Sequence, residues 1–376
     1  MKKVLFIATV VKTHINVFHL PYIQMFKENG YKTFVAAKND FENEEPVIPY
    51  CDSYEDIPFS RNPFNLKNIA SYRKLKKLIE EEKFDIVQCN TPVGGVLGRL
   101  AARKMRKNGT RIIYIAHGFH FLKGGPLLSW VIFYPIEKFL SCITDVLVTI
   151  NHEDYSLALK HFGAVRTAYI HGVGVDTEKI ENCKPDRNKV RAEFFIKEND
   201  TVLISVGELR ALKNHKVIIE AMAKLGRRDI HYIIAGEGPM REELRSIASR
   251  LGLCDNIHLP GFRGDIYELL KSSDIFCFPS KREGLPVSLM EAMASGLAAV
   301  VSCVRGNTDL VCNNKGGFIY SCDDACGFAH GIKKLTEDKN LRRNMGQFNK
   351  EFVKKYDIKI VKEELSKIYF SKTSQF

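Results

Sequence analysis

Long apolar runs are missing from this 376-residue sequence. The longest nearly uncharged apolar stretches, such as Pro126 to Ile136, are well short of the roughly 20 residues that a membrane-spanning helix needs. The start of the chain is basic and then briefly apolar, like a secretion signal, but no small-residue cleavage site follows. We therefore expect a buried first strand over Val4–Val10 and no membrane-spanning segment.

Paired cysteines and the common nucleotide motifs are also missing. The ten cysteines include no C-x-x-C motif and no His/Cys cluster at zinc spacing, so we expect buried, reduced thiols in a cytoplasm. No G-x-G-x-x-G follows the first predicted strand and no G-x-x-x-x-G-K-[ST] occurs, which disfavours nicotinamide dehydrogenases and P-loop enzymes. There is no D-x-D to hold a metal on a nucleotide diphosphate. We therefore expect no metal, and a bound diphosphate would need lysine, arginine and helix N-termini.

Positive charge, in contrast, is abundant and evenly spread. The net charge is +12, and residues 1–184 and 185–376 each carry +6. Nucleic-acid-binding proteins usually concentrate their basic residues on one face or segment. The even spread disfavours nucleic acid as a partner and leaves anionic lipid or a phosphorylated substrate.

Apolar strands alternate with helical patterns along the whole chain, which indicates an α/β protein with parallel sheets. The length fits two doubly wound domains, and we place their boundary in the Gly-rich stretch His171–Asp176, giving 1–173 and 174–357. The last predicted helix, Ile358–Tyr369, is amphipathic, and we expect residues 358–376 to pack back on the first domain. The predicted strands are Val4–Val10, Thr33–Ala37, Asp85–Cys89, Arg111–Ala116, Asp145–Ile150, Thr201–Val206, His231–Ala235, Asn256–Leu259, Asp274–Phe278 and Leu297–Ser302.

Ligands of open α/β sheets bind where strands end and helices begin, and two such corners in the second half are rich in glycine or cations. At the first corner, Gly207 ends a strand, and Arg210 and Lys213 precede a helix, which suits an anion. At the second, Gly236 and Gly238 allow the backbone to approach a ligand closely. The alternatives are a solvated loop and an ordinary tight turn.

A third corner, Phe278–Gly296, carries two carboxylates near one predicted helix start. Glu291 lies among apolar residues, where an unpaired carboxylate would be costly. Carboxylates suit ligand hydroxyls, and the free N–H groups of a helix start suit phosphate, so the corner fits a sugar nucleotide. For Glu291 alone, a solvated helix face is the alternative. The residues expected here are Glu283, Gly284, Leu285, Pro286, Val287, Ser288 and Glu291.

The pair Glu283 and Glu291, followed by Ala292–Gly296, resembles the E-x7-E signature of glycosyltransferase family 4. Ala116–Asp154 is similar to a bacterial branch of that family that builds capsular and exopolysaccharide repeat units. The resemblance implies a GT-B architecture, in which two Rossmann-like domains face each other across a cleft. It also implies retaining, metal-free transfer of a hexose or N-acetylhexosamine. Further matching segments are Val206-Gly207, Lys213-Asn214, Gly236–Pro239, Gly261–Arg263 and Asp274–Ser280.

The resemblance implies roles for individual residues. Glu283 would contact hydroxyls of the donor sugar, and Glu291 those of the ribose. Backbone N–H groups after Gly284 would bind the diphosphate, and Lys213 would neutralise the leaving phosphate. His117, at the end of a predicted strand, matches the family's active-site histidine, so we expect its ring to face the transferred sugar. A structural histidine is the alternative.

Two departures from the family pattern stand out. Glu208 occupies a position that is usually arginine, so Arg210 or Arg282 would have to replace that charge. Arg263, in a matching segment, is a further donor-binding candidate.

The second departure is in the loop after the first strand, which lacks the usual Gly-Gly turn. Here His14, Asn16 and His19 are candidate acceptor contacts, together with His120, and a plain loop is the alternative.

The segment Leu122–Leu140 has one Trp, several aromatics and leucines, and flanking lysines, a composition that suits a membrane interface. A buried helix is the alternative. The basic stretch Arg99–Lys107 would add attraction to anionic lipid. Acceptors in this branch are carried on lipid diphosphates, so we expect a UDP-sugar donor, a lipid-linked saccharide acceptor and peripheral binding at the inner face of the cell membrane. The rival functions are a sugar-nucleotide 2-epimerase and a non-catalytic sugar-nucleotide-binding partner.

Overall fold

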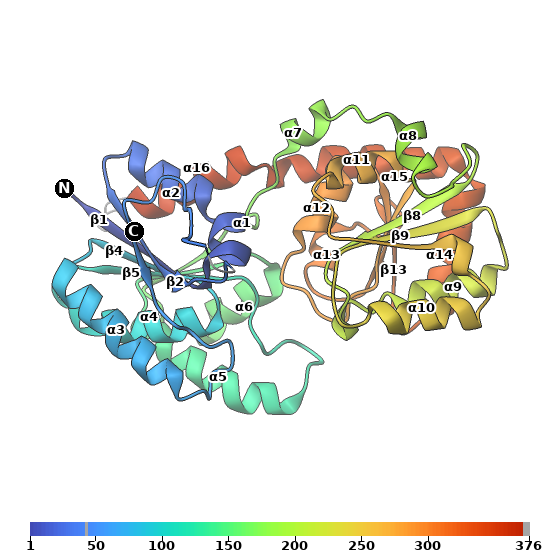
Figure 1. Cartoon of the computed structure of the whole chain (residues 1–376). Coiled ribbons are helices and arrows are strands. Elements are labelled where there is room, and N and C mark those ends of the chain that lie inside the picture. Colours follow the sequence, from blue (N-terminus) through green and yellow to red (C-terminus); the bar gives the residue numbers. More distant parts are fainter. Residues whose placement is uncertain (42–43, 371–376) are drawn as a thin grey trace. The chain divides into compact units, whose positions relative to one another are not determined.

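The computed structural model describes residues 1–41 and 44–370, and the chain divides into two compact units. Unit 1 comprises Met1–Gly172 and the chain from Glu364 onward, and unit 2 comprises Val173–Glu363. Each unit has a parallel sheet with helices packed against it (Figure 1). The predicted α/β class with two Rossmann-like units is confirmed.

The sheet of unit 1 has seven described strands in the order β3-β2-β1-β4-β5-β6-β7. The central strand β1 is apolar and completely buried from Val4 to Ala8, as expected for a parallel strand covered on both faces. The sequence pattern missed β3 and β7 because these short edge strands are polar and only partly buried. The strands are β1 (Lys3–Val10), β2 (Lys32–Lys38), β3 (Ser53–Asp56), β4 (Ile86–Cys89), β5 (Arg111–Ala116), β6 (Val146–Thr149) and β7 (Arg166–Tyr169).

Helices cover both faces of this sheet, with α2 on one side and α3 and α4 on the other (Figure 1). In α3, Leu75 and Ile79 are buried at four-residue spacing, which is the apolar stripe that makes this highly charged helix pack. The helices of unit 1 are η1 (Val11–Ile15, a π-helical turn), α1 (Asn16–Phe18), α2 (Leu20–Glu28), α3 (Lys67–Glu82), α4 (Pro92–Arg106), α5 (Leu127–Ser141) and α6 (His152–His161).

The last helix, α16 (Ile358–Phe370), is divided between the units, and its C-terminal turns pack on unit 1. The Tyr369 hydroxyl donates to Gln88 Oε1 at 2.5 Å, and Arg111 donates to the Tyr369 carbonyl at 2.9 Å. Phe26 of α2 packs against the rings of Tyr369 and Phe370. The end of the described chain therefore helps to close the core of the first unit.

The sheet of unit 2 has six described strands in the order β10-β9-β8-β11-β12-β13. The sequence pattern missed β13 because it begins with glycine. A Cβ at Gly317 would lie 1.9 Å from the Ala299 carbonyl oxygen, so the close approach of β12 requires glycine there. The strands are β8 (Thr201–Val206), β9 (Ile230–Ala235), β10 (Ile257–Gly261), β11 (Ile275–Phe278), β12 (Ala298–Ser302) and β13 (Gly317–Tyr320).

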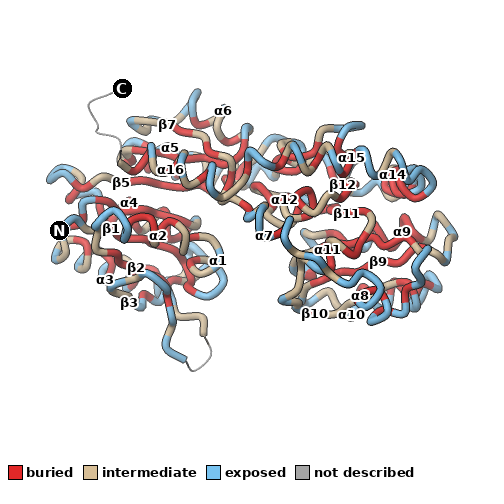
Figure 2. The backbone as a smooth tube through the Cα atoms, turned by 90° about the horizontal axis from the view of Figure 1, so that it is seen from above, coloured by how far each residue is buried: buried red, intermediate tan, exposed pale blue. Residues whose placement is uncertain are grey.

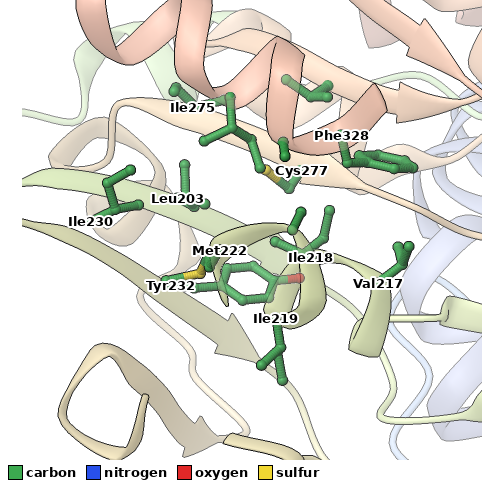
Figure 3. Packing of buried hydrophobic residues seen from close by; sticks show 14 of the residues in the cluster. Leu203, Val217, Ile218, Ile219, Met222, Ile230, Tyr232, Ile275, Cys277 and Phe328 are labelled. Atoms are coloured by element: carbon green, nitrogen blue, oxygen red, sulfur yellow. The ribbon is translucent and has the colours of Figure 1, made fainter. Parts of the chain in front are cut away.

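The core of unit 2 joins these strands to α9 and α14. Figure 3 shows Leu203, Tyr232 and Cys277 from the sheet packed near Met222 of α9 and Phe328 of α14. Figure 2 shows the same pattern along the backbone, with burial concentrated in strands and inward helix faces. The helices are α7 (Thr177–Asn182), α8 (Arg187–Ala192), η2 (Ala211–Lys213), α9 (Lys216–Leu225), α10 (Arg241–Arg250), η3 (Cys254–Asn256), α11 (Ile266–Ser272), α12 (Val287–Ala294), α13 (Asn307–Leu310), α14 (Ala325–Glu337), α15 (Lys339–Phe352) and η4 (Val353–Tyr356).

The cysteines are free, but the prediction that each is buried is wrong. Cys89 and Cys277 lie in the buried strands β4 and β11, whereas others lie in loops and at helix ends, where the chain meets solvent. The exposed cysteines are Cys142, Cys254, Cys303 and Cys326. Across residues 1–41 and 44–370, no helix combines the length and the apolar character needed to cross a membrane.

Candidate functional site

The glycine-rich corners of unit 2 form where β8 and β9 end. Gly236 and Gly238 have φ of +155° and +156°, and a Cβ would lie 2.0 Å from the Gly207 carbonyl oxygen and 2.5 Å from that of Leu209, respectively. Only glycine fits such a close approach of two loops. Backbone hydrogen bonds complete the junction, because Leu209 N–H donates to the Glu237 carbonyl at 2.8 Å. The glycines thus allow the loops after β8 and β9 to pack closely against each other at this corner.

Lys213 and Glu283, two of the predicted catalytic residues, are brought together at this corner. Lys213 Nζ lies 2.7 Å from Glu283 Oε1, and only 11% of the Glu283 side chain is exposed. The ammonium also lies 4.8 Å from the centre of the Phe278 ring at the end of β11. A pair that is 70 residues apart in sequence is therefore held at the ends of β8 and β11, with low solvent exposure that strengthens its electrostatics.

The loop that carries Glu283 is held by an arginine that sequence reasoning missed. Arg305 is 6% exposed, and its Nε donates to the Glu283 carbonyl at 3.0 Å. Lys281 N–H donates to the Leu212 carbonyl at 2.8 Å, which ties this loop to η2. Burial and the nearby Arg305 lower the pKa of Arg282. The corner therefore gathers several cations near Glu283. The sequence signal that could have identified Arg305 was a single arginine in the loop after β12.

The second carboxylate of the signature lies on α12. Tyr267 of α11 lies beside Glu291 and interacts with it electrostatically, and the sequence pattern did not indicate this neighbour. Burial raises the pKa of Glu291 to about 7. The helix begins after Pro286, which has no side-chain acceptor to cap the first N–H groups. Leu285 and Pro286 are buried, while Gly284, Val287 and Ser288 are half-buried.

Two predicted donor-binding arginines have carboxylate partners of their own. Arg210 pairs with Glu208, the residue that departs from the family pattern, and both side chains are more than half exposed. Arg263 is paired with Asp265 at 2.6 Å and with Glu193, and these hydrogen bonds raise its pKa. The donor-binding roles of both arginines stay predictions.

Unit 1 brings together three of the predicted histidines. His14 in η1, His19 before α2 and His117 after β5 place one ring nitrogen each within 4.8 Å of the others, and His14 Nε2 lies 3.2 Å from His19 Nε2. Burial lowers the pKa of His117 to about 4 and lowers those of His14 and His19 well below their usual value. The cluster is therefore neutral at pH 7. His117 Nε2 is buried and has no hydrogen-bond partner within the part of the chain described here.

This histidine cluster can act in two ways. Neutral imidazoles can donate or accept hydrogen bonds to a bound hydroxyl, and three of them are also a known ligand set for a divalent transition metal. The other two acceptor candidates lie outside the cluster. Asn16 Nδ2 donates to the Val47 carbonyl at 3.0 Å, and the His120 ring packs against Phe133 with centroids 5.0 Å apart.

Comparison with known proteins identifies the family of this chain. Residues 3–151 match the family model "Glycosyl transferase 4-like", and residues 186–352 match "Glycosyl transferases group 1". "Putative glycosyltransferase EpsD" of Bacillus subtilis (strain 168) is 40% identical over 373 residues, covering 98% of this chain and 96% of the relative. "UDP-Gal:alpha-D-GlcNAc-diphosphoundecaprenol alpha-1,3-galactosyltransferase" of Escherichia coli is 29% identical over 79% of each chain.

Among solved structures, Anabaena HepE in complex with UDP and glucose has a TM-score of 0.81 at 18% identity, covering 98% of this chain and 99% of that one. This similarity concerns the fold, which is that of GT-B proteins with two Rossmann-like units. Because one relative is 40% identical over nearly its whole length and both family models match, the chain belongs to glycosyltransferase family 4.

Proposed function

We propose that this chain is a retaining, metal-independent transferase that moves a hexose or N-acetylhexosamine from a UDP-sugar to a saccharide carried on a lipid diphosphate. The chain is a glycosyltransferase of polysaccharide synthesis by its family membership. The donor base, the stereochemical course and the acceptor are the new elements of the proposal. A relative whose name specifies UDP-Gal and a diphosphoundecaprenol acceptor supports these choices.

The observation that carries the proposal is the Lys213–Glu283 pair at 2.7 Å beside the start of α12. A sugar donor has hydroxyls that a carboxylate can accept from and a diphosphate that needs positive charge. Glu283 supplies the carboxylate, and Lys213 supplies the charge. The free N–H groups in the first turn of α12 can donate hydrogen bonds to an anion, as helix N-termini commonly do. Glu291, about one turn after the start of α12, is the candidate for the ribose.

The chemistry that follows needs little covalent participation by the protein. The acceptor oxygen forms a bond to the anomeric carbon on the face from which the diphosphate leaves, and the bond from that carbon to the phosphate oxygen breaks. The leaving phosphate takes the acceptor's proton, and Lys213 offsets its negative charge. The rate enhancement then comes mainly from positioning and from preorganised electrostatics.

A lipid-linked acceptor would place the protein at the inner face of the cell membrane, bound peripherally. Basic residues at the end of α4, including Arg103, Lys104 and Lys107, are available for attraction to anionic headgroups. Binding to vesicles that contain anionic lipid should therefore weaken as salt is raised.

The test is transfer by the purified chain. UDP- and GDP-sugars are first screened for thermal stabilisation, since a ligand that binds the folded state raises the melting temperature by mass action. Transfer to a synthetic saccharide diphosphate lipid is then followed, and NMR of the product gives the anomeric configuration. We expect a UDP-sugar to stabilise, the product to retain the donor's configuration, and activity to survive a chelator.

Three outcomes would contradict parts of the proposal. An inverted product would refute the retaining course. Loss of activity with a chelator and recovery with zinc would refute metal independence and assign the metal to the histidine cluster. Donor binding without hydrolysis or transfer would favour a non-catalytic sugar-nucleotide-binding partner.

A further inference from the structure

Helix α5 exposes apolar side chains and buries its one carboxylate. Leu127, Leu128 and Val131 are 78%, 67% and 64% exposed, whereas its one carboxylate, Glu137, is buried. Glu137 pairs with the fully buried Arg99 of α4 at 2.8 Å. Exposed apolar surface of this extent usually marks an interaction site. The ion pair joins α5 to α4, while Leu127, Leu128 and Val131 lie on the exposed side of α5.

Under this helix lies a cavity of about 640 Å³, within the size range of ligand sites. Its walls are mainly apolar and include Val96 and Leu97 of α4 with Ile132 and Phe133 of α5. Glu137 also borders the cavity, but its charge is already paired with Arg99. Sugars are bound by unpaired carboxylates and amides, so these walls suit a hydrocarbon better than a saccharide.

A second cavity, of about 520 Å³, adjoins this apolar cavity. The two share Val10, Thr13 and Arg61, and the second is also bordered by Lys38 and Lys67. Its one carboxylate, Asp40, accepts hydrogen bonds from the Lys12 and Thr13 backbone N–H groups and from the Thr13 hydroxyl. The cations therefore exceed the acidic charge, as a phosphorylated group requires.

The apolar cavity also opens toward the surface. Phe64 borders both this cavity and a neighbouring depression that reaches Leu66 and Ile69. Phe64, Leu66 and Ile69 are 73%, 78% and 51% exposed. A chain too long for the cavity would therefore leave it across further apolar surface.

We propose that these two cavities form the binding site for the lipid diphosphate part of the acceptor, with the hydrocarbon next to the diphosphate held between α4 and α5 and the diphosphate held at Arg61. The inference rests on the proposed function for the lipid-linked acceptor and extends it to a place in unit 1. Apolar walls joined to a cationic mouth match an amphiphile with an anionic head. The histidine His14 borders the same cavity, which places the candidate acceptor cluster beside it.

Binding can be measured without turnover. Trp130 is the only tryptophan of the chain, and its ring packs on Phe121, which borders the cavity, with centroids 5.2 Å apart. Its fluorescence should therefore report occupancy. The probes are farnesyl diphosphate below its micelle-forming concentration, inorganic pyrophosphate and farnesol. We expect farnesyl diphosphate to bind at least about tenfold more tightly than pyrophosphate, because each buried methylene adds affinity.

Variants separate the two ends of the site. Ile132→Glu places a charge on the apolar wall and should reduce farnesyl diphosphate affinity about tenfold or more while changing pyrophosphate binding little. Val96→Phe narrows the same space without a charge and should act in the same direction. Arg61→Gln should weaken farnesyl diphosphate and pyrophosphate to a similar extent. Leu159→Glu, at an exposed position of α6 outside both cavities, is the matched control and should bind like the parent chain.

The outcomes distinguish this inference from the proposed function. Equal affinity for farnesyl diphosphate and pyrophosphate, or an Ile132→Glu effect no larger than that of Leu159→Glu, would overturn the site even if transfer to short-chain acceptors is active. Farnesol binding as tightly as farnesyl diphosphate would overturn it by showing an apolar pocket without a head-group site. Absence of transfer with every sugar nucleotide would instead refute the proposed function while leaving a positive binding result intact.

Discussion

The two units share one fold class but build their candidate sites from opposite chemistry. In unit 2 the site is polar and compact, with a Lys213–Glu283 pair at 2.7 Å on a floor of glycine loops. In unit 1 it is an apolar cavity of about 640 Å³ that is bordered by His14, a member of the neutral histidine cluster. The same sheet architecture therefore offers one corner for a charged, hydroxyl-rich molecule and one for an amphiphile, since strand-end loops and not strands decide ligand chemistry.

The strongest test of the polar site is Glu283→Gln, which keeps the shape and removes the charge. Loss of one contact that strengthens in the transition state should lower the turnover number about 100-fold or more. Steady-state transfer kinetics give the value. Glu242→Gln, at an exposed position of α10, is the control and should retain parental turnover. Parental activity in Glu283→Gln would remove that residue from the chemistry.

The next largest effect is expected for Lys213→Ala, which tests whether the Lys213 ammonium binds a phosphate of the donor. A hydrogen bond to a charged group contributes about 1.5–3 kcal/mol, so affinity for UDP should fall about 10- to 100-fold. Affinity for uridine, which has no phosphate, should stay within a factor of about two on this account. Calorimetric titration measures both, with Lys224→Ala on α9 as the control. An equal loss for UDP and uridine would show that Lys213 supports the loop and not the phosphate.

In unit 1, the variant His117→Ala tests the role of the histidine cluster. Because burial holds the pKa of His117 near 4, the ring is neutral over the working range. We expect turnover to fall about tenfold, as for a modest acid–base or positioning contact. We also expect the contribution of His117 to be constant from pH 6 to 8 and lost only as pH falls through about 4. A variant-to-parent activity ratio that changes between pH 6 and 8 would contradict the neutral cluster, and His161→Ala on α6 is the control.

The smallest expected effect is on stability and concerns Glu291. Its folded-state pKa is raised to about 7 from 4.5, so the folded form holds its proton more tightly than the unfolded form. Its destabilising contribution is therefore absent below about pH 4.5, grows as pH rises to about 7 and is constant above that. Each kcal/mol of stability corresponds to about 2–4 °C in melting temperature for a unit of this size.

Glu291→Gln should accordingly gain a few degrees in melting temperature relative to the parent chain at pH 8, and little at pH 5. Calorimetric melts at both pH values measure the difference. Glu268→Gln, at an exposed position of the neighbouring α11, controls for loss of a carboxylate. A gain that is the same at both pH values would show that burial does not govern this carboxylate.

Much of the candidate site in unit 2 could be predicted from sequence because its residues lie in short contiguous segments. Gly236–Pro239 lies between the end of β9 and the start of α10, and Glu283–Glu291 covers part of a loop and the start of α12. Arg305 and Tyr267 were missed because each comes from a different loop or helix and is brought to the site only by the order of the sheet. The donor-binding role of Arg210 stays a prediction, and only the structure shows that this residue pairs with Glu208.

In unit 1 the prediction reached single residues but not their arrangement. His14, His19 and His117 were each candidates, yet nothing in their spacing indicates that three ring nitrogens meet within 4.8 Å. The segment Leu122–Leu140 was predicted as interfacial on its composition, with a buried helix as the alternative. The structure shows a helix that exposes Leu127 and Leu128 and buries Glu137. A periodicity argument cannot find the burial of Glu137, because its partner is Arg99 on another helix.

The amino-acid sequence by itself determined the α/β class, the existence of two Rossmann-like units and the nucleotide-sugar signature, because strand and helix periodicity and glycine requirements are local properties of the chain. Only the tertiary structure decided which cations surround Glu283, that the histidines of unit 1 are neutral, and that an apolar cavity adjoins a cationic one. Those features depend on burial and on contacts between distant segments, and both come into being only when the sheets assemble.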